Sequence, residues 1–296
     1  MEPNLVILAG GISSRMKNAA STPSGLEPGL LRDARDKAKS MIGVGEHRRP
    51  FLDYVLFNAR EAGYRDIVIV TGENDSSIRE HYGPADEGNE IAGLRISYAI
   101  QPIPAGRTKP LGTADALLHA LRSRAASQWH AFTVCNSDNL YSRLALKTML
   151  ECPDPGGMID YDRAALEFSQ DRIEQFAVTE ISPDGYLIAL IEKPSPDVIV
   201  RLLRTHGRIG VSMNIFRLTN ELIRSCLEEL SPDPVRQEKE LPAAVQMMAG
   251  RHPGSVRAIP LAEHVPDLTH LSDILAVQQF LETRFPDFSF DRKTSS

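Results

Sequence analysis

The chain has 296 residues, of which 42% are hydrophobic and 24% charged, a composition typical of a soluble globular protein rather than a disordered one. Lysine and arginine number 33 against 39 aspartates and glutamates, and the net charge of -6 excludes a globally basic surface for nucleic acid or an anionic membrane. The three cysteines, Cys135, Cys152 and Cys226, form no CxxC motif, which argues against a zinc site and a disulfide framework. No run approaches the roughly 20 apolar residues of a membrane span. We therefore expect a cytoplasmic protein whose partners include neither nucleic acid nor a membrane.

In the first half of the chain, short apolar segments alternate with segments whose apolar residues recur at helical spacing. Strands are predicted for residues 4–8, 66–72, 94–101 and 131–139, and helices for residues 51–63, 77–83 and 113–124, with a further helix beginning near Ser142. This alternation predicts a parallel sheet covered by helices, which binds its ligands beyond the carboxyl ends of the strands.

The second half is more mixed and contains no internal repeat. Strands are predicted for residues 174–181, 185–194, 207–218 and 255–261, and helices for residues 218–230, 239–250 and 270–284. Residues 17–38 break the rhythm of the first half with Ser, Pro and Gly and then with charged side chains. We expect these residues to form a mobile surface insertion between two parts of one site.

The first predicted strand runs into the segment AGGISSR, residues 9–15. Its two glycines let the backbone turn and approach a ligand closely, and its serines and arginine supply hydroxyls and a permanent cation for a triphosphate. The residues that we expect around the nucleotide here are Leu8, Ala9, Gly10, Gly11, Ser14 and Arg15. The spacing matches neither a P-loop nor GxGxxG, so a tight turn without a ligand is an equal alternative on this segment alone.

A second polar group follows the strand predicted for residues 131–139. Asp138 stands at its carboxyl end between polar neighbours, where a carboxylate is well placed to hold Mg²⁺ between phosphates. The alternative is that Asp138 caps the helix that begins near Ser142.

Six segments in the same order resemble the nucleotidyltransferases that act on sugar 1-phosphates. The opening segment is similar to their LAGGxxxR(M/L) signature, and the lysine that follows it in the family is best matched by Lys39, with Lys37 two residues away. The other matching segments are residues 101–117, 134–139, 191–196, 210–216 and 265–274. The resemblance implies an α/β, Rossmann-like fold of the GT-A type, with a mixed, mainly parallel sheet flanked by helices and a smaller acceptor-binding region. It also implies one nucleotidyltransferase domain over residues 1–296, with a nucleotide-binding half (1–150) and a sugar-phosphate-binding half (151–296).

The resemblance implies that a nucleoside monophosphate passes from a nucleoside triphosphate to a sugar 1-phosphate, with release of pyrophosphate and with Mg²⁺ as cofactor. Arg15 and Lys39 are then the catalytic cations on the triphosphate. Lys193 would hold the sugar phosphate and Glu192 the sugar hydroxyls. The alternative for Glu192 and Lys193 is an exposed strand end before a proline turn.

Asp267 matches the late aspartate of the family and is the implied second metal ligand beside Asp138. This chain has Val265 and Pro266 where the family usually has tryptophan before that aspartate, which makes Asp267 the less secure of the two ligands. His264 and a second nearby histidine are expected to be structural or solvated rather than metal ligands.

The segment KPLGTADAL is implied to lie under the nucleobase. Gly112 allows close backbone approach, Thr113 is expected to cap the helix that follows, and Gln101 can read a base edge with its amide. Ser212 and Asn214 are the implied sugar contacts, although the family often has glycine in place of Asn214. Two charges of the loop before the helix, Arg107 and Lys109, are expected to be solvated, with a contact to the phosphates as the alternative.

Several alternatives stay open. One is a cytidylyl- or guanylyltransferase of the kind that acts on molybdenum cofactor or on choline and alditol phosphates. Another is a GT-A glycosyltransferase, and a third is a regulator that binds nucleotide or sugar phosphate without turnover. The sequence does not choose the nucleobase or the sugar, and it is compatible with a homo-oligomer.

Overall fold

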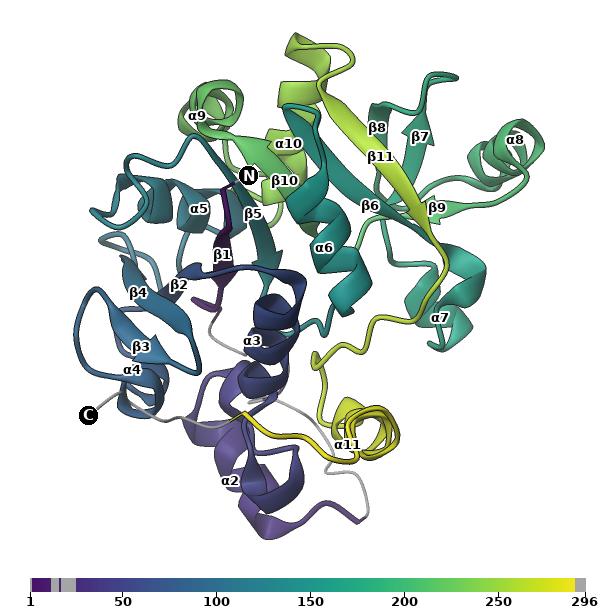
Figure 1. The fold of residues 1–296 in the computed structure, drawn as a ribbon. Coiled ribbons are helices and arrows are strands. Elements are labelled where there is room, and N and C mark those ends of the chain that lie inside the picture. Colours follow the sequence, from purple (N-terminus) through teal and green to yellow (C-terminus); the bar gives the residue numbers. More distant parts are fainter. Residues whose placement is uncertain (1, 12–15, 17–24, 291–296) are drawn as a thin grey trace.

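The computed structural model describes residues 2–11, 16 and 25–290 of the chain (Figure 1). Among these residues, one sheet of eleven strands has the order β3-β4-β2-β1-β5-β10-β6-β9-β7-β8, with β11 also paired to β6. The strands are β1 (Asn4–Leu8), β2 (Asp66–Gly72), β3 (Asn89–Ile91), β4 (Leu94–Gln101), β5 (Ala131–Asn136), β6 (Gly156–Asp162), β7 (Val178–Ile181), β8 (Leu187–Ile191), β9 (Gly210–Val211), β10 (Ile215–Thr219) and β11 (Val256–Leu261).

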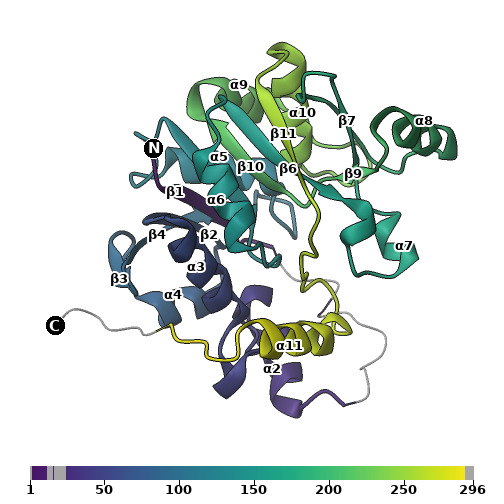
Figure 2. The same ribbon diagram turned by 45° about the vertical axis from the view of Figure 1, so that its right-hand side comes forward.

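Helices surround this sheet on both faces (Figures 1 and 2). They are α2 (Pro28–Asp36), α3 (Phe51–Ala62), α4 (Ser77–Tyr82), α5 (Thr113–Arg122), α6 (Arg143–Glu151), α7 (Gln170–Ile173), α8 (Pro196–His206), α9 (Asn220–Glu229), α10 (Leu241–Arg251) and α11 (Asp273–Arg284). Short 3-10 turns are η1 (Lys39–Met41), η2 (Glu46–Arg48) and η3 (Arg163–Ala165). None of the helices in the described part of the chain has the length and apolar character needed to cross a membrane.

Strand directions divide the sheet into a parallel and a mixed part. β1 pairs in parallel with β2 and β5, and β2 pairs in parallel with β4. β10 runs antiparallel to β5 and β6, whereas β11 runs parallel to β6. The predicted α/β fold with a mixed, mainly parallel sheet is thereby confirmed.

Each face of the central strand β1 is covered by its own layer of helices. Leu5 and Ile7 belong to the core that includes residues of α3, α6 and α11, whereas Val6 and Leu8 belong to the core that includes residues of α5, α9 and α10. Successive side chains of a strand point to opposite faces, so a strand buried on both faces is apolar throughout. This burial explains why residues 4–8 form an unbroken apolar run.

The last described segment of the chain packs against α3, far away in sequence. Phe288 stacks on Tyr54 with ring centroids 4.0 Å apart, and Phe285 meets Phe57 edge to face at 6.1 Å. Phe290 is buried in the same core. Residues 285–290 therefore close a core that α3 begins.

Helix and strand boundaries agree with the predictions where local chemistry determines them. Ser142 is the N-cap of α6, because its Oγ accepts a hydrogen bond from the backbone N–H of Ala145 at 3.0 Å.

The single strand predicted for residues 207–218 is instead two strands, β9 and β10. Asn214, between them, has a φ of 59°, which a β-strand does not accommodate.

The sequence patterns do not predict β3, β6, α7 or α8. In β6, the polar Asp160 interrupts the apolar pattern and is nevertheless buried. It accepts a hydrogen bond from the Thr179 hydroxyl at 2.5 Å and forms an ion pair with Arg208. Burial of a carboxylate becomes favourable when such partners come from elsewhere in the chain, and no local pattern contains them.

The described part of the predicted insertion at residues 17–38 is folded, which corrects the expectation of a mobile segment there. Asp33 of α2 is buried, and its Oδ2 accepts hydrogen bonds from the backbone N–H of Gly43 at 3.1 Å and from Arg48 Nη2 at 2.6 Å. These bonds anchor α2 to the turns that follow it. Residues 17–24 lie outside the described part.

Gly63 is the C-cap of α3. Its φ of 110° lies in the left-handed region, and an added Cβ would lie 3.1 Å from Leu150 Cδ2. We predict that Gly63→Ala lowers the free energy of unfolding by about 1–2 kcal/mol in equilibrium urea denaturation. Gly250→Ala in α10 is the control, because nothing lies within 4 Å of its Cβ position. It should raise the free energy of unfolding by about 0.5–1 kcal/mol, and equal effects of both changes would contradict this account.

Candidate active site

A cavity of about 480 Å³ lies beyond the carboxyl ends of β1, β4 and β5, where a parallel sheet is expected to bind ligands. Most of the predicted site residues line it. They are Leu8, Ala9, Gly10, Gly11, Lys39, Gln101, Gly112, Thr113, Asp138, Ser212, Asn214 and Asp267. Segments from both halves of the chain therefore meet around one cavity.

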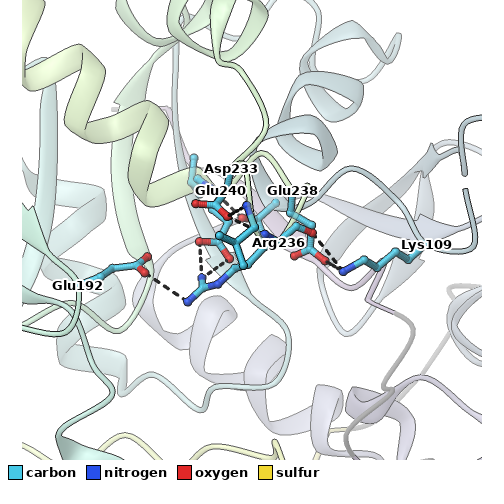
Figure 3. Close-up of polar contacts among 9 residues, drawn as sticks. Lys109, Glu192, Asp233, Arg236, Glu238 and Glu240 are labelled. Carbon is cyan, nitrogen blue, oxygen red and sulfur yellow. Dashed lines mark hydrogen bonds and ion pairs between the residues drawn. The ribbon is translucent and has the colours of Figure 1, made fainter.

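The other predicted residues lie elsewhere. Ser14 and Arg15 are outside the described residues. Glu192 and Lys193 follow β8, are exposed, and are not part of the cavity wall. Glu192 Oε2 forms an ion pair with Arg236 Nη2 at 3.3 Å (Figure 3). The roles of Glu192 and Lys193 at the acceptor stay predictions.

At one end of the cavity a lysine meets a carboxylate. Lys39 begins the turn η1, and its Nζ lies 2.9 Å from Asp138 Oδ2 in the turn after β5. Lys37 forms an ion pair with Asp33 of α2 at 3.0 Å and does not line the cavity. Of the two lysines that the sequence offers, the geometry therefore places Lys39 at the cavity.

Backbone pairing brings Asp267 to the same place. The N–H of Leu268 donates to the carbonyl of Asp138 at 2.8 Å, and the N–H of Leu140 donates to the carbonyl of Pro266 at 2.8 Å. Burial and the neighbouring charge of Asp138 raise the pKa of Asp267 from 3.8 to about 6. The two aspartates are therefore adjacent, and their mutual repulsion opposes full ionisation.

A cation that the sequence analysis does not single out faces Asp267. Arg172 of α7 lies with Nη2 3.0 Å from Asp267 Oδ2 and Nη1 2.7 Å from Asp273 Oδ1. Its guanidinium also lies 4.4 Å from the ring centroid of Phe168. Only the tertiary fold joins α7 to these aspartates, so no local motif could have indicated Arg172.

The donor set suits a hard cation that is shared with a substrate. Mg²⁺ binds oxygen ligands and is typically held by one or two carboxylates together with substrate phosphates. Asp138 and Asp267 supply two carboxylates, and the described residues contain no group of three or more His, Cys, Asp or Glu side chains that could hold a metal. His264 accepts a hydrogen bond at Nδ1 from the backbone N–H of Glu167, and burial lowers its pKa. These contacts agree with the expected structural role of His264.

At the other end of the cavity, Gln101 is buried and uses its amide internally. Its Nε2 donates to the carbonyl of Gly112 and to Asp115 Oδ2, both at 2.8 Å. Gly112, not Thr113, is the N-cap residue of α5, which corrects the predicted cap. The Thr113 hydroxyl instead accepts a hydrogen bond from the backbone N–H of Leu241 at 2.8 Å.

Two glutamates that the sequence analysis does not single out, Glu238 and Glu240, precede α10 and belong to the cavity wall. Lys109, expected to be solvated, forms an ion pair with Glu238 at 2.5 Å, and Arg236 Nη1 lies 2.8 Å from Glu240 Oε2 (Figure 3). Lys109, Glu238 and Glu240 all line the cavity. In the sequence, the only sign of these residues is a pair of glutamates within three positions. Tertiary packing, which the sequence pattern does not contain, brings them to the cavity.

The φ of 59° at Asn214 accounts for its departure from the resembling family. This is the left-handed region, which glycine adopts most readily and asparagine more readily than most other residues. The backbone N–H of Asn214 donates to Ser212 Oγ at 3.3 Å. Asparagine therefore preserves a backbone shape for which glycine is the usual choice.

Comparison with known proteins decides the family. The family model described as nucleotidyl transferase matches residues 34–283. The chain belongs to the nucleotidyl transferase family. The resemblance of its motifs to the sugar-1-phosphate enzymes is thereby confirmed at the level of the family.

Curated relatives of this nucleotidyl transferase include glucose-1-phosphate adenylyltransferase 2 of Vibrio cholerae, 26% identical over 76% of this chain and 51% of the relative. Glucose-1-phosphate adenylyltransferase 1 of Vibrio vulnificus is 28% identical over 64% of this chain and 43% of its own length. The chain thus spans about half the length of the curated relatives it matches.

A crystal structure of UDP-glucose pyrophosphorylase complexed with UDP-glucose shares the fold. The TM-score is 0.67 with 17% identity, and the match covers 96% of this chain and all of the other.

Asp267 makes the stability of this nucleotidyl transferase depend on pH. The pKa of about 6 in the folded chain lies above the ordinary value, so the stability that this proton contributes is full below about pH 4 and is lost as the pH rises through 6. We predict that, without divalent metal, the free energy of unfolding falls by on the order of 1 kcal/mol between pH 5 and 7.5 relative to Asp267→Asn. Urea denaturation at both pH values measures this. Asp197→Asn, on exposed α8, is the control, and a difference that does not vary with pH would contradict the assignment.

Proposed function

We propose that the protein transfers the nucleotidyl group of a nucleoside triphosphate to a sugar 1-phosphate, giving a nucleoside diphosphate sugar and pyrophosphate. The observation that carries this proposal is the convergence of Lys39, Asp138 and Asp267 at one end of a cavity of about 480 Å³. Glucose 1-phosphate is the first acceptor to test, because the names of the curated relatives include it.

The chemistry requires charge neutralisation rather than a general base. A phosphate oxygen of the acceptor, already an anion, attacks the α-phosphorus in line. A new P–O bond forms there, the bond to the oxygen shared with the β-phosphate breaks, and pyrophosphate leaves. Lys39, together with Arg15, neutralises the charge that develops on pyrophosphate. Mg²⁺ held by Asp138 and Asp267 would supply further neutralisation between the phosphates.

The two halves of the chain take different substrates in this proposal. The first half, residues 1–150, supplies most of the wall at the proposed nucleotide end of the cavity. From the second half, Ser212 and Asn214 lie in the cavity wall and are proposed for the sugar. Glu192 and Lys193 are proposed for the hydroxyls and phosphate of the acceptor on the motif resemblance alone.

The cysteines support a reducing compartment, and we propose the cytoplasm. Cys135, Cys152 and Cys226 are all unpaired and buried. Thiols of this kind persist where glutathione and thioredoxin keep them reduced.

The test is pyrophosphate release with Mg²⁺ across five nucleoside triphosphates and a panel of acceptors. The panel contains the 1-phosphates of glucose, mannose, galactose and N-acetylglucosamine, with phosphocholine as the runner-up acceptor class. Release that requires one sugar 1-phosphate supports the proposal. Release with phosphocholine alone favours the runner-up, and nucleotide binding without release with any acceptor favours a regulator.

Lys39 and Lys37 form a matched pair for a kinetic test. We predict that Lys39→Met lowers kcat by roughly 10²-fold or more, because a cation that stabilises the leaving group is lost. Lys37→Met, which removes only the ion pair with Asp33, should leave kcat unchanged. Steady-state pyrophosphate release measures both, with circular dichroism to verify folding. Equal loss in both variants would remove Lys39 from the reaction.

A further inference from the structure

The end of the cavity farthest from Asp138 is lined by Gln101 and by two glutamates, Glu238 and Glu240. In the sheet, β2 and β1 separate β4 from β5, so Gln101 at the end of β4 lies about three strand spacings, or ~14 Å, from the end of β5. A nucleotide whose phosphates lie near Lys39 and Asp138 therefore extends its base toward Gln101. The wall there also contains Lys109.

Gln101 offers a base no hydrogen-bond donor. Both hydrogens of its Nε2 are used, by the carbonyl of Gly112 and by Asp115 Oδ2. Its Oε1 remains an acceptor and lies 3.0 Å from the position of a Cβ on Gly10. A carbonyl oxygen of uracil or cytosine would find no donor on this side chain.

Glu238 and Glu240 add acceptors to the same wall. Carboxylates only accept, at about four positions each, so Lys109 and Arg236 leave both with unused capacity. Burial raises the pKa of Glu240, because the buried carboxylate has lost part of its hydration. Hydrogen-bond donors on a ligand would replace that hydration. Figure 3 shows the two carboxylates on one segment, two residues apart, with the Lys109 ammonium beside Glu238.

Backbone contacts hold these acids in position. The N–H of Lys239 donates to the carbonyl of Leu111 at 2.5 Å, and the N–H of Ala114 donates to the carbonyl of Lys239 at 2.9 Å. An added Cβ on Gly112 would lie 2.6 Å from that same carbonyl oxygen. Glu238 and Glu240 flank Lys239, whose N–H and carbonyl are both hydrogen-bonded, so the backbone positions of the two glutamates are fixed without a ligand.

We propose that the nucleotide is guanosine triphosphate, with the carboxylates of Glu238 and Glu240 accepting from the base and Lys109 donating to it. Guanine presents N1–H and the 2-amino group side by side, next to the acceptors O6 and N7. Adenine has a ring acceptor in place of N1–H, and uracil has one N–H between two carbonyls. Of these three bases, only guanine has two adjacent donors, N1–H and the 2-amino group, for the carboxylates of Glu238 and Glu240. Its O6 is an acceptor for the neighbouring ammonium of Lys109.

This proposal rests on the proposed function and is tested with the same reaction. Initial rates with GTP, ATP, UTP and ITP are measured with the acceptor that works best. The kcat/KM for GTP should exceed that for ATP and UTP by roughly tenfold or more, with ITP, which lacks the 2-amino group, in between. Glu240→Gln and Glu238→Gln should reduce the ratio of GTP to ATP, mainly through KM for GTP. Glu229→Gln is the control, since Glu229 is also paired with an arginine but lies outside the cavity.

The outcomes distinguish failure of the guanine assignment from failure of the proposed transferase function. A wild-type preference for ATP or UTP overturns the guanine assignment and leaves the transferase function intact. Absence of pyrophosphate release with every pair overturns the function, and calorimetric binding of GTP against ATP then tests the base assignment alone. An unchanged GTP preference in both glutamine variants, with folding verified, removes these glutamates from base selection.

A second cavity, of about 440 Å³, carries an independent proposal. It lies at the opposite end of the sheet, where β5 begins and β10 ends. Arg217 in its wall is 7% exposed, and within the described part of the chain it has no ion pair and its Nη1 has no hydrogen-bond partner. Thr219 Oγ1, in the same wall, is buried and also lacks a partner.

A buried guanidinium is costly unless an anion compensates its charge. Asp154 in the same wall is already bound to Arg257 at 3.3 Å and to the Tyr186 hydroxyl at 3.0 Å. We infer that this cavity binds a small oxyanion, a phosphate or carboxylate group, through Arg217 and Thr219. Glu221 also lines the cavity and is the internal alternative.

Inorganic phosphate is the probe for this second site. At constant ionic strength, phosphate should raise the Tm of the wild type and of Lys39→Met, but not of Arg217→Met, and less in Thr219→Val. Without phosphate, Arg217→Met should not lower Tm, because a buried unpaired charge is removed. Loss of the shift in Lys39→Met rather than Arg217→Met places phosphate in the first cavity and overturns the inference. A lower Tm of Arg217→Met without phosphate indicates internal pairing, as with Glu221, and also overturns it.

Discussion

The backbone pairing of residues 138–140 with residues 266–268 determines the form of the site. Two hydrogen bonds of 2.8 Å join a turn in the first half of the chain to a segment near its end. They place the carboxylates of Asp138 and Asp267 side by side, an arrangement that like charges oppose. Lys39 on one side and Arg172 on the other supply the compensating charge. Because Arg172 also pairs with Asp273, the site joins three carboxylates and two cations contributed by separated segments.

Much of the fold could be predicted from the sequence because its first half is regular. β1, β2, β4 and β5 are buried on one or both faces and read as short apolar runs, and the helices between them have helical spacing. β6 could not be predicted, because Asp160 depends on partners that arrive from β7 and the α8–β9 turn. α2 was obscured by its polar composition, since the partners of Asp33 are supplied by tertiary contacts.

The site divides in the same way. Residues at the ends of parallel strands, such as Gly10, Gln101 and Asp138, could be predicted to meet, because the sheet itself brings these ends together. Glu238 and Glu240 could not, since hydrogen bonds between Lys239 and the segment around Gly112 bring them there. Glu192 and Lys193 stay predictions, outside the wall. The order of the motifs in the sequence was therefore enough to indicate the family, but not to predict where each side chain lies.

The packing of the chain end on α3 has a consequence for the order of assembly during synthesis. Phe285 and Phe288 cover Tyr54 and Phe57, which leave the ribosome long before them. Until residues 266–290 have been synthesised, α3 presents an aromatic surface to solvent, and the turn at Asp138 lacks the segment that pairs with it. Contacts of such high sequence separation form late and slowly. This domain therefore cannot complete its core until residues 285–290 have been synthesised, and chains that stop before Phe285 would expose an aromatic surface that promotes aggregation.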